Sequence, residues 1–464
     1  MVRIAGDAPE RGFQQGFLLA SEIRGVMRSL RYLTYIDTGK EWEFFVNAAR
    51  KLFAPHLGLE YTEELKGMAA GLEAAREADH DLVSAETPAP GYPVLGAGGA
   101  ITSSVERETD PAAGISWLDL LAWNGYIELL DYWWPKQREG QYRPGSMVEH
   151  GGCSAFIATG SCTSDGKVVM GHNSWDNFET GQFFNVILDV RPDEGNRILM
   201  QSPPGSLHSA TDFFLTGAGI AGCETTIGGF REYDPSGVPE FIRVRDAMQY
   251  AGSLDGFVEK MVDGNNGGYA NGWLLADTRS REILRLELGL QYNSVDRTKD
   301  GYFIGCNAPF DPRIRNLECE NSGFADIRRH QGARQVRLTQ LMEDHYGKLD
   351  CERAKAILAD HHDVYLGRDN PCSRTVDGHY ELDSRDVMSQ SGRPLPFQPR
   401  GTVDGKVIDS SLAADWSFLA RWGNSSGMPF NAGEFIDRHI QWRHLDGYLM
   451  DRPERPWVKI RGGE

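Results

Sequence analysis

A change of hydrophobic period near residue 152 constrains the fold of this chain more than any other feature. Before it, residues 10–30 and 41–78 carry apolar side chains at three- and four-residue spacings, as amphipathic helices do. Another helix, strongly aromatic, is expected over 117–134 and ends at Pro135. After the change, short β-rich runs alternate with turn signals. These runs are SAFIATGSC, KVVMGHN, FFNVILDVR, RILMQS, FFLTGAGIAGCETT, GWLLADT, EILRLELG and GYFIGCN.

Later segments complete this pattern. Residues 326–360 are typical of a helix, and VDGKVIDSSLA indicates a strand or hairpin. Helices first, then many antiparallel-looking strands, then late helices predict an α+β fold in layers. The 464 residues suffice for one large domain or two ordinary ones.

The net charge limits the partners of the chain. A value of −18 disfavours nucleic acid and unassisted binding to an anionic membrane surface. No run of about 18 apolar residues occurs, so no transmembrane helix is expected. The first residues, MVRIAGDAPERGFQQG, lack the apolar core of a signal peptide. As given, the chain is expected in the cytoplasm; secretion or a periplasmic location is the alternative if a leader was trimmed.

Cysteines and histidines give no metal signature. Seven cysteines occur without a CxxC pair, so neither a zinc ribbon nor a thioredoxin-type site is expected. A disulfide among Cys319, Cys351 and Cys372 stays open. His361 and His362 are flanked by acids, but adjacent side chains on a helix point apart, so no shared ion is expected. We expect no metal and no organic cofactor.

The stretch HGGCSAFIATGSCTSDGKVVMGHNSWDNF predicts a hairpin around one cysteine. Asp165-Gly166 is a strong two-residue turn signal. In the register that this turn sets, Cys153 faces Phe178, and Asp176 lies diagonal to Cys153 on the same face. Such a diagonal spans roughly 7–8 Å between backbones, within reach of side chains or a water.

The glycines before this cysteine indicate a cleavage site. Gly151 and Gly152 leave the backbone flexible and uncrowded. The Cys153 thiol can attack the Gly152 carbonyl and, through an ester-like intermediate, release Cys153 as a new N-terminus. An α-amine with a pKa of about 7.7–8.0 then serves as general base for its own thiol. The alternative is a small buried cysteine in a strand.

Further blocks carry a family resemblance over residues 10–425, approximately. They are RGFQQGFLLA, LDLLAWNGYIELLD, SPPGSLHSATDFFLTGAGIAGCETT, NNGGYANGWLLAD, YFIGCNAPFDPRI, DNPCSRTVDGH and GTVDGKVID. With the cysteine hairpin, they resemble the phospholipase B-like proteins and the penicillin acyltransferase-type autoproteolytic hydrolases. The resemblance implies an N-terminal nucleophile (Ntn) hydrolase fold, a four-layer αββα sandwich of two antiparallel sheets between helices. It also implies two parts: 1–152, a helical propeptide or small subunit on the core, and 153–464, the catalytic core.

The resemblance assigns roles to individual residues. Cys153 is the expected nucleophile. His172, Trp175 and Asp176 match the family's segment near the active site: Asp176 orients the amine or the cysteine backbone, and Trp175 lines the acyl pocket. Asn271 matches the asparagine of the oxyanion hole, where a side-chain amide donor is worth roughly 10²–10³ in rate.

Two further residues, Asn307 and Arg374, lie in family-like blocks and are expected to bind substrate.

Each of these residues has a plainer interpretation that the sequence leaves open. His172 can bond to backbone at a strand end, and Trp175 can be core packing. Asp176 can cap a turn, and Asn271, next to a glycine, can form one. Arg374 can simply pair with an acid.

Two other motifs are expected to be coincidental. Residues 217–222 spell GxGxxG, but no helix follows, so a dinucleotide site is not expected. Residues 423–427 spell GxSxG, yet Met428-Pro429-Phe430 does not open the helix that a serine nucleophile requires.

The predicted activity is acyl transfer from the amide bond of an N-acylated small molecule to water or an amine, through an acyl-cysteine. One alternative is hydrolysis of a lipid ester by the same cysteine. Another is a scaffold that binds ligand without catalysis. The expected partner is a small amide or lipid-like substrate, and homo-oligomerisation stays open.

Overall fold

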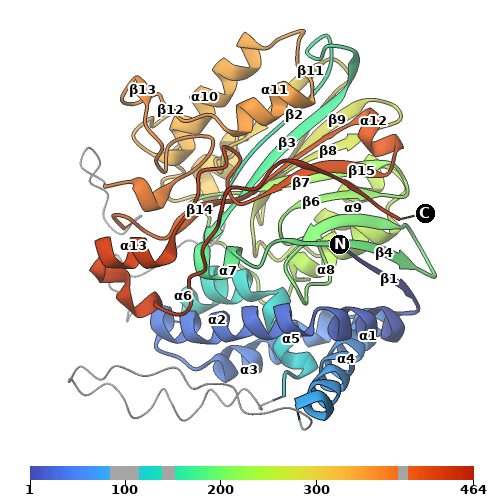
Figure 1. Ribbon diagram of the computed structural model, residues 1–464. Helices are drawn as coiled ribbons and strands as arrows, with labels where there is room; N and C mark the ends of the chain where they lie inside the picture. Colours follow the sequence, from blue (N-terminus) through green and yellow to red (C-terminus); the bar gives the residue numbers. More distant parts are fainter. Residues whose placement is uncertain (84–113, 138–151, 385–394, 464) are drawn as a thin grey trace.

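The structure is a computed structural model that describes residues 1–83, 114–137, 152–384 and 395–463. The described chain forms four layers: helices, an eight-stranded sheet, a six-stranded sheet and a second helical layer (Figure 1). The predicted α+β fold of two sheets between helices is confirmed. None of the helices in these ranges combines the length and apolar character needed to cross a membrane.

Both sheets are almost entirely antiparallel; the exception is the parallel pair β1–β4. The eight-stranded sheet has the order β1 (Val2–Gly6), β4 (Val186–Pro192), β5 (Ile198–Ser202), β6 (Phe213–Thr216), β7 (Ile220–Thr226), β8 (Asn271–Asp277), β9 (Glu282–Leu288) and β10 (Asn293–Thr298). The six-stranded sheet has the order β11 (Gly301–Gly305), β2 (Cys153–Gly160), β3 (Gly166–Asn177), β14 (Arg400–Asp409), β15 (Ser417–Trp422) and β16 (Val458–Arg461).

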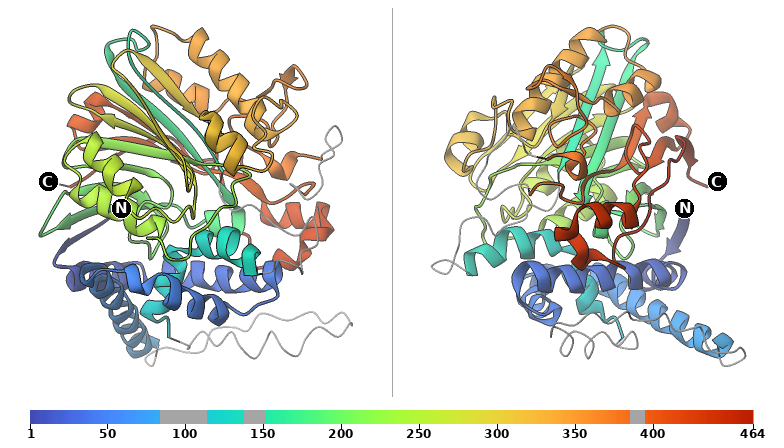
Figure 2. Two further views of the ribbon diagram at one scale, coloured as in Figure 1. Left: turned by 180° about the vertical axis from the view of Figure 1, so that it is seen from behind. Right: turned by 60° about the vertical axis from the view of Figure 1, so that its left-hand side comes forward.

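Helices cover the outer face of each sheet (Figure 2). One hydrophobic cluster joins the eight-stranded sheet to α2 (Ala20–Thr38), α3 (Trp42–Leu52), α4 (Leu59–Val83), α5 (Trp117–Asn124), α8 (Glu240–Tyr250) and α9 (Leu254–Val262). Helix α1 (Ala8–Leu18) packs against α4. Another cluster joins the six-stranded sheet to α10 (His330–Asp344) and α11 (Cys351–Leu358). The shorter elements are η1 (Ala54–His56), η2 (Glu128–Trp133), α6 (Trp134–Gln137), α7 (Phe178–Gly181), η3 (Ile314–Glu318), β12 (His362–Asp363), β13 (Arg368–Asp369), η4 (Tyr380–Leu382), α12 (Ser410–Ala414), α13 (Ala432–Arg438) and η5 (Ile440–Leu445).

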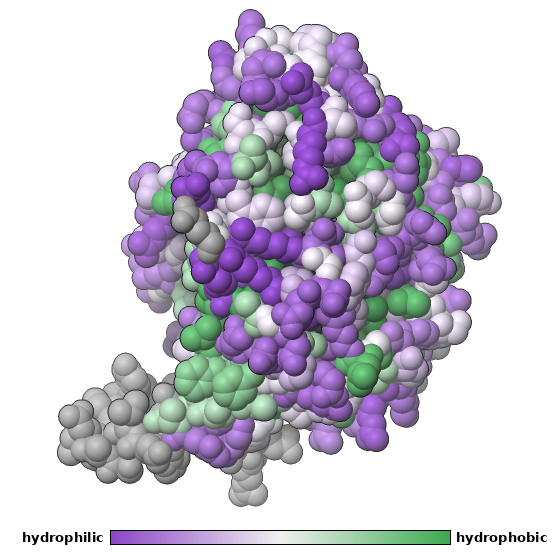
Figure 3. Space-filling model, turned by 90° about the vertical axis from the view of Figure 1, so that its right-hand side faces the viewer, coloured by the Kyte–Doolittle hydropathy of each residue, from purple (hydrophilic) through white to green (hydrophobic). Residues whose placement is uncertain are grey.

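Strand β2 shows why the middle of the chain is continuously apolar. Its residues alternate between two cores: Ala155 and Ile157 pack between the sheets, while Phe156 and Ala158 pack toward α10 and α11. A strand buried on both faces needs apolar side chains at every position. Polar residues predominate on the outer surface that Figure 3 displays, where apolar residues form small groups.

Several predicted boundaries are wrong in detail. The helix expected over 117–134 is α5 followed by the π-helical turn η2, and Pro135 lies inside α6 instead of ending a helix. Proline is tolerated there because the first turn of a helix needs no donor from it. Residues 326–360 form two helices, α10 and α11, and strands β1, β10, β15 and β16 were not predicted.

Candidate active site

The cysteine hairpin forms, but in a different register from the predicted one. Cys153 opens β2 and pairs with Ser174, four residues before the predicted partner Phe178. The two-residue turn does not form because the chain leaves the ladder earlier. There, Ser164 N–H donates to the Leu349 carbonyl at 2.9 Å, and Ser161 N–H donates to Asp300 Oδ1 at 2.6 Å.

The even size of this shift preserves the predicted relation between the side chains. A slip by an odd number of residues moves a strand's side chains to the other face, whereas an even slip does not. Cys153 therefore still shares a face with Asp176, and His172 is its other diagonal neighbour across the pair.

Three hydrogen bonds hold the chain on both sides of the predicted cleavage site. The Gly152 carbonyl accepts from the Trp175 N–H at 2.7 Å. The Cys153 N–H donates to Asn307 Oδ1 at 2.9 Å. Arg334 Nη1 donates to the Cys153 carbonyl. The Gly152–Cys153 bond is thus fixed in position, with a donor directed at its carbonyl oxygen and an acceptor at its nitrogen.

Asn307 is held in place by its own neighbours. Its Nδ2 donates to the Thr226 carbonyl at 2.7 Å, and its Oδ1 also accepts from Arg334 Nη2 at 2.7 Å. Its φ of 63° is in the left-handed region, as are those of Asp212 (55°) and Tyr269 (51°). Such conformations are costly for non-glycine residues and cluster at functional sites.

Arg334, on α10, was not predicted from the sequence. Its guanidinium carbon lies 3.9 Å from the centre of the Trp175 ring, and burial lowers its pKa to about 10. Trp175 is buried between this arginine, His330 and Tyr380. It is therefore placed to support the backbone of the cleavage site, and it is not among the residues that line the pocket described below.

The thiol of Cys153 lies in an enclosed and acidic environment. Cys153 is only 3% exposed, and burial, followed by the nearby Glu224 and Asp212, raises the pKa of its thiol well above the usual value. Lys406 opposes this shift. The intact chain therefore holds the thiol protonated.

Lys406 is a fully buried cation beside this thiol. Its Nζ donates to Ser174 Oγ at 2.6 Å and to the Thr211 carbonyl at 2.8 Å, and it pairs with Asp404 Oδ1 at 2.7 Å. It extends from β14, where it is the ladder partner of His172. Lys406 was not among the predicted site residues, although it lies within the block GTVDGKVID.

Asp212 and Glu224 form a buried pair of carboxyl groups. Burial is the main cause that raises both pKa values, to about 7 for Asp212, and the proximity of Asp212 raises that of Glu224 further. The Tyr269 hydroxyl lies 3.5 Å from Asp212 Oδ2. The pair can therefore hold or accept a proton near neutral pH. Neither residue was predicted, although Glu224 belongs to the CETT block.

His172 and Asp176 lie on either side of the cysteine position. His172 Nε2 donates to the Glu224 carbonyl at 2.8 Å, and its Nδ1 is buried without a hydrogen-bond partner in the described part of the chain. Burial lowers its pKa well below the usual value, so the ring is neutral. Asp176 accepts from the Asn177 N–H at 2.7 Å and from the Tyr126 hydroxyl at 3.4 Å.

Asn271 is at the start of β8, opposite Thr226, whose carbonyl binds Asn307. Its Nδ2 donates to Glu240 Oε1 at 3.3 Å. Its Oδ1 is buried with no partner among the described residues. The Asn271 amide therefore lies near the residues that contact Cys153, but its N–H donor is hydrogen-bonded to Glu240.

A small pocket lies next to these residues. It is lined by Trp123, Asn124, Gly125, Tyr126, Ile127, Glu128, Pro203, Ser206, His208, Ala210, Glu240, Phe241 and Tyr269. Cys153 does not line it. Two of its lining residues reach the surroundings of Cys153. Tyr126 contacts Asp176, and Tyr269 is close enough to Cys153 for the cysteine to raise the pKa of the tyrosine.

The side chain of Arg374 is bonded elsewhere. It forms a buried ion pair with Asp363, with 2.6 Å between Nη2 and Oδ2. The alternative of simple pairing with an acid therefore describes its surroundings, and the acid is buried, not on the surface.

The GxGxxG motif runs from a turn into β7, and the GxSxG motif lies in a turn. Residues 217–219 connect β6 to β7. The Ser425 hydroxyl donates to Asn173 Oδ1 at 2.6 Å, and the next helix, α13, begins only at Ala432. All seven cysteines lie in the described ranges, and none is in a disulfide.

Comparison with known proteins confirms the predicted resemblance. The family model described as Phospholipase B matches residues 105–288. Phospholipase B of Crotalus adamanteus is 27% identical over 325 residues, which are 64% of this chain and 54% of that protein. Phospholipase-B 81 of Drysdalia coronoides is 26% identical over 326 residues, with the same shares. The chain thus spans about half the length of the curated relatives it matches.

One solved structure that matches part of this chain is a mutant of conjugated bile acid hydrolase from Clostridium perfringens. It is 9% identical, covers 58% of this chain and 89% of its own, and gives a TM-score of 0.33. A similarity this low carries no argument about function.

Proposed function

We propose that this chain, which is similar to the phospholipase B-like proteins, is the precursor of an N-terminal-cysteine hydrolase that cuts itself between Gly152 and Cys153. One observation carries the proposal: both atoms of that peptide bond that need support have it. The carbonyl oxygen accepts from the Trp175 N–H, and the nitrogen donates to Asn307 Oδ1. The first of these bonds continues the ladder between β2 and β3, and the second comes from a side chain 154 residues further along the chain.

Cleavage proceeds by transfer of the acyl group from nitrogen to sulfur. The thiol loses its proton, Sγ bonds to the Gly152 carbonyl carbon, and the bond from that carbon to the Cys153 nitrogen breaks. The nitrogen takes a proton and becomes the α-amine. Water then hydrolyses the thioester, which leaves a carboxylate on Gly152 and a free thiol on Cys153. The N–H of Trp175 stabilises the negative oxygen of the tetrahedral intermediate.

The buried acids and Lys406 determine where the thiol proton goes in this step. The thiol pKa is raised, so a nearby base has to accept its proton. Asp212, whose pKa burial raises to about 7, takes this role, and Lys406 stabilises the thiolate. After cleavage, the α-amine, held by Asn307, takes over as the base for turnover.

Turnover repeats the same chemistry on an external amide. The thiolate bonds to the acyl carbon of the substrate, the leaving amine takes the proton from the α-ammonium, and water releases the acid from the acyl-cysteine. The amide of Asn271 donates to the oxyanion once substrate displaces its contact with Glu240. The walls formed by Trp123, Ile127 and Phe241 suit an apolar acyl group.

Both pieces belong to the mature enzyme in this proposal. Residues 123–128, which precede the cleavage site, line the pocket, and Tyr126 contacts Asp176. Strand β1 is part of the eight-stranded sheet. The N-terminal piece therefore stays bound after cleavage, and release of the new carboxyl end at Gly152 opens the path from the pocket to the thiol.

Intact mass and N-terminal sequencing of the purified protein test the proposal. Division of 51.7 kDa in proportion to length gives pieces of about 17 and about 35 kDa, the larger beginning at Cys153. They should elute together under native conditions. A persistent full-length chain that no acyl reagent labels at Cys153 would instead support a scaffold without catalysis.

Hydrolysis of a lipid ester by the same cysteine is the second candidate, because the matched relatives carry the name phospholipase B. Assays of N-acyl amides and of phospholipids on a single cleaved preparation decide between the two substrates. Faster release of fatty acid from phospholipid would favour the ester.

A further inference from the structure

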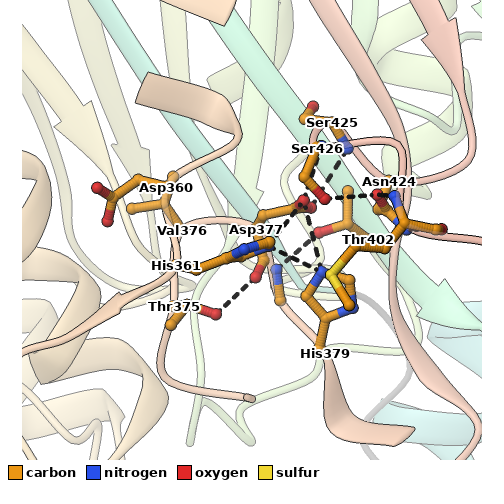
Figure 4. Close-up of polar contacts among 12 residues, drawn as sticks. Asp360, His361, Thr375, Val376, Asp377, His379, Thr402, Asn424, Ser425 and Ser426 are labelled. Carbon is orange, nitrogen blue, oxygen red and sulfur yellow. Dashed lines mark hydrogen bonds and ion pairs between the residues drawn. The ribbon is translucent and has the colours of Figure 1, made fainter. Parts of the chain in front are cut away.

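A second group of ionisable side chains lies behind the cysteine hairpin. His361, Asp377 and His379 point toward one another in Figure 4. Their segment packs on the face of β2 and β3 opposite to the thiol, because Ser154 and Asn173 alternate with Cys153 and Ser174 along these strands.

The separations among the three side chains match the geometry of a bound metal ion. His361 Nε2 lies 3.1 Å from His379 Nε2 and 3.3 Å from Asp377 Oδ2, and the third separation is 3.5 Å. Zinc binds nitrogen and oxygen at about 2.0–2.2 Å, so two ligand atoms of a tetrahedral site are about 3.3–3.5 Å apart. All three atoms are therefore already close to the corners of one coordination tetrahedron.

Surrounding groups orient two of these side chains. Glu381 Oε1 accepts from His379 Nδ1 at 2.8 Å, which directs Nε2 toward the other two residues. A carboxylate on the second nitrogen is the usual support of a metal-binding histidine. Asp377 accepts from the backbone N–H groups of Ser426 at 2.9 Å and Ser425 at 3.3 Å. Asp377 and His379 are buried, while His361 is partly exposed, so a water can reach a fourth position.

We propose that His361, Asp377 and His379 form a binding site for one Zn²⁺ ion, with water as the fourth ligand. His361 and His362 do diverge as expected, since His362 faces Asp369, but the other ligands come from 16 and 18 residues further along the chain. The ion ties the turn after α11 to residues 377–379. Between them, the Val376 carbonyl accepts from Ser154 Oγ at 2.8 Å, so the site braces the strand that carries the nucleophile.

A metal-free ion network is the competing explanation. Burial alone would lower the pKa of His379, but Glu381 and Asp377 raise it to about 10. A protonated His379 can then donate to both carboxylates. This arrangement predicts no stoichiometric metal, which makes the two explanations separable.

Calorimetric titration of the full-length, untagged chain with Zn²⁺ tests the site. The chain carries Cys153→Ala, so that the thiol cannot bind the ion, and is first stripped with a chelator. We expect one equivalent to bind and the melting temperature to rise with Zn²⁺ concentration. Co²⁺ in place of Zn²⁺ should give the visible absorption of a tetrahedral site. None of these measurements depends on cleavage or turnover, so this proposal and the proposed function can fail separately.

Variants locate the binding to these residues. His379→Ala and His361→Gln should abolish the saturable equivalent, and Glu381→Gln should weaken binding roughly 10–100-fold. His362→Ala, at the neighbouring histidine, is the matched control and should bind as the parent does. Circular dichroism verifies that each variant is folded. If a variant does not fold, the titration of the parent chain still tests the proposal. The parent keeps all three ligands and must bind one equivalent of Zn²⁺. No saturable equivalent in the parent, or unchanged binding in folded His361→Gln, would overturn the proposal.

Discussion

Two groups of buried charges in this molecule differ in how they are balanced. Where α1, α4 and α8 meet, Glu64 accepts from Arg11 at 2.8 Å and from Arg245 at 3.0 Å. Arg11 also binds Glu60 at 2.9 Å. Burial would raise the pKa of Glu60, but hydrogen bonds from Tyr250, Gln249 and Arg11 lower it below the usual value. Two arginines thus face two carboxylates.

The group between the pocket and Cys153 has no such balance. Burial is the largest cause that raises the pKa values of Asp212, Glu224, Glu240 and Glu128, the last to about 7. Lys406 and Arg243 oppose these shifts only in part. Because these acids outnumber the cations beside them, they keep their protons to a higher pH than usual.

The difference separates a group that stabilises the fold from one that is suited to chemistry. Paired buried charges keep their ordinary protonation, and removal of one partner costs stability. Strongly perturbed acids beside a cleft are instead typical of functional sites. Changes in the first group should therefore alter stability, and changes in the second should alter cleavage, turnover and their pH dependence.

Cys153→Ala should have the largest effect. It removes the nucleophile, so the chain should stay at 51.7 kDa, and turnover should fall on the order of 10⁶-fold. Gel electrophoresis and an acyl-release assay measure the two effects. Cys162→Ala, at a second buried cysteine, is the control that should still be cut. Normal hydrolysis by Cys153→Ala would remove Cys153 from the mechanism, and an inactive Ser425→Ala would then point to the GxSxG serine.

Glu64→Gln should have the next largest effect, and on stability. It leaves Arg11 and Arg245 without their shared charge, which should lower the free energy of unfolding by about 3–5 kcal/mol. Urea denaturation measures this loss. Glu63→Gln, which breaks an exposed pair with Lys66, should cost less than about 1 kcal/mol. Loss of cleavage in a folded Glu64→Gln chain would contradict the separation of the two groups.

Asn271→Ala should separate turnover from maturation. The amide is expected to serve the oxyanion of substrate, so kcat should fall roughly 10²–10³-fold. Self-cleavage, which uses the Trp175 N–H, should continue. The free energy of unfolding should fall by about 1–3 kcal/mol, because the buried Glu240 Oε1 loses the Asn271 donor. Steady-state kinetics and intact mass give the two readouts. Asn47→Ala, on the exposed side of α3, is the control. Normal kcat with blocked cleavage would reverse the assignment.

Glu128→Gln should have the smallest effect, visible in the pH dependence of stability. Glu128 titrates at about 7 in the folded chain and near 4.3 when unfolded, so the folded state binds the extra proton between these values. Its contribution is present at low pH and is lost as pH rises toward 7, by up to about 1.4 kcal/mol per pH unit. The pKa of Glu60 is lowered, so its contribution to stability has the opposite pH dependence. That contribution is present above about pH 4 and is lost as the pH falls below this value.

The urea midpoint at several values between pH 4 and pH 8 measures this dependence. Between pH 4 and pH 7 the stability of the wild type should decline more steeply than that of Glu128→Gln, and above pH 7 the two slopes should converge. Equal slopes in the two proteins would show that Glu128 titrates normally and would weaken the contrast between the two groups.

Local patterns in the sequence predicted the layers and the face of the hairpin that Cys153 shares with Asp176. The change of period at residue 152 marks where helices give way to sheets, because side-chain direction follows from local backbone geometry. The alternation along β2 and β3 placed Asp176 on the face of Cys153 even though the register was wrong by four residues. The proposed role of the glycine before Cys153 also follows from neighbouring residues alone.

The partners of the cysteine were decided only by the tertiary structure. Arg334 reaches the Cys153 carbonyl across 181 positions, and Lys406 reaches Ser174 across 232. Contacts of Ser164 with Leu349 override the turn signal at Asp165-Gly166. The hydrophobic period of a segment predicts which face of a helix or strand a side chain takes. It does not predict which distant segments pack together, and a single sequence carries no local signal for that. Such packing decides how buried charges are compensated, which register the strands adopt, and that His361 meets His379.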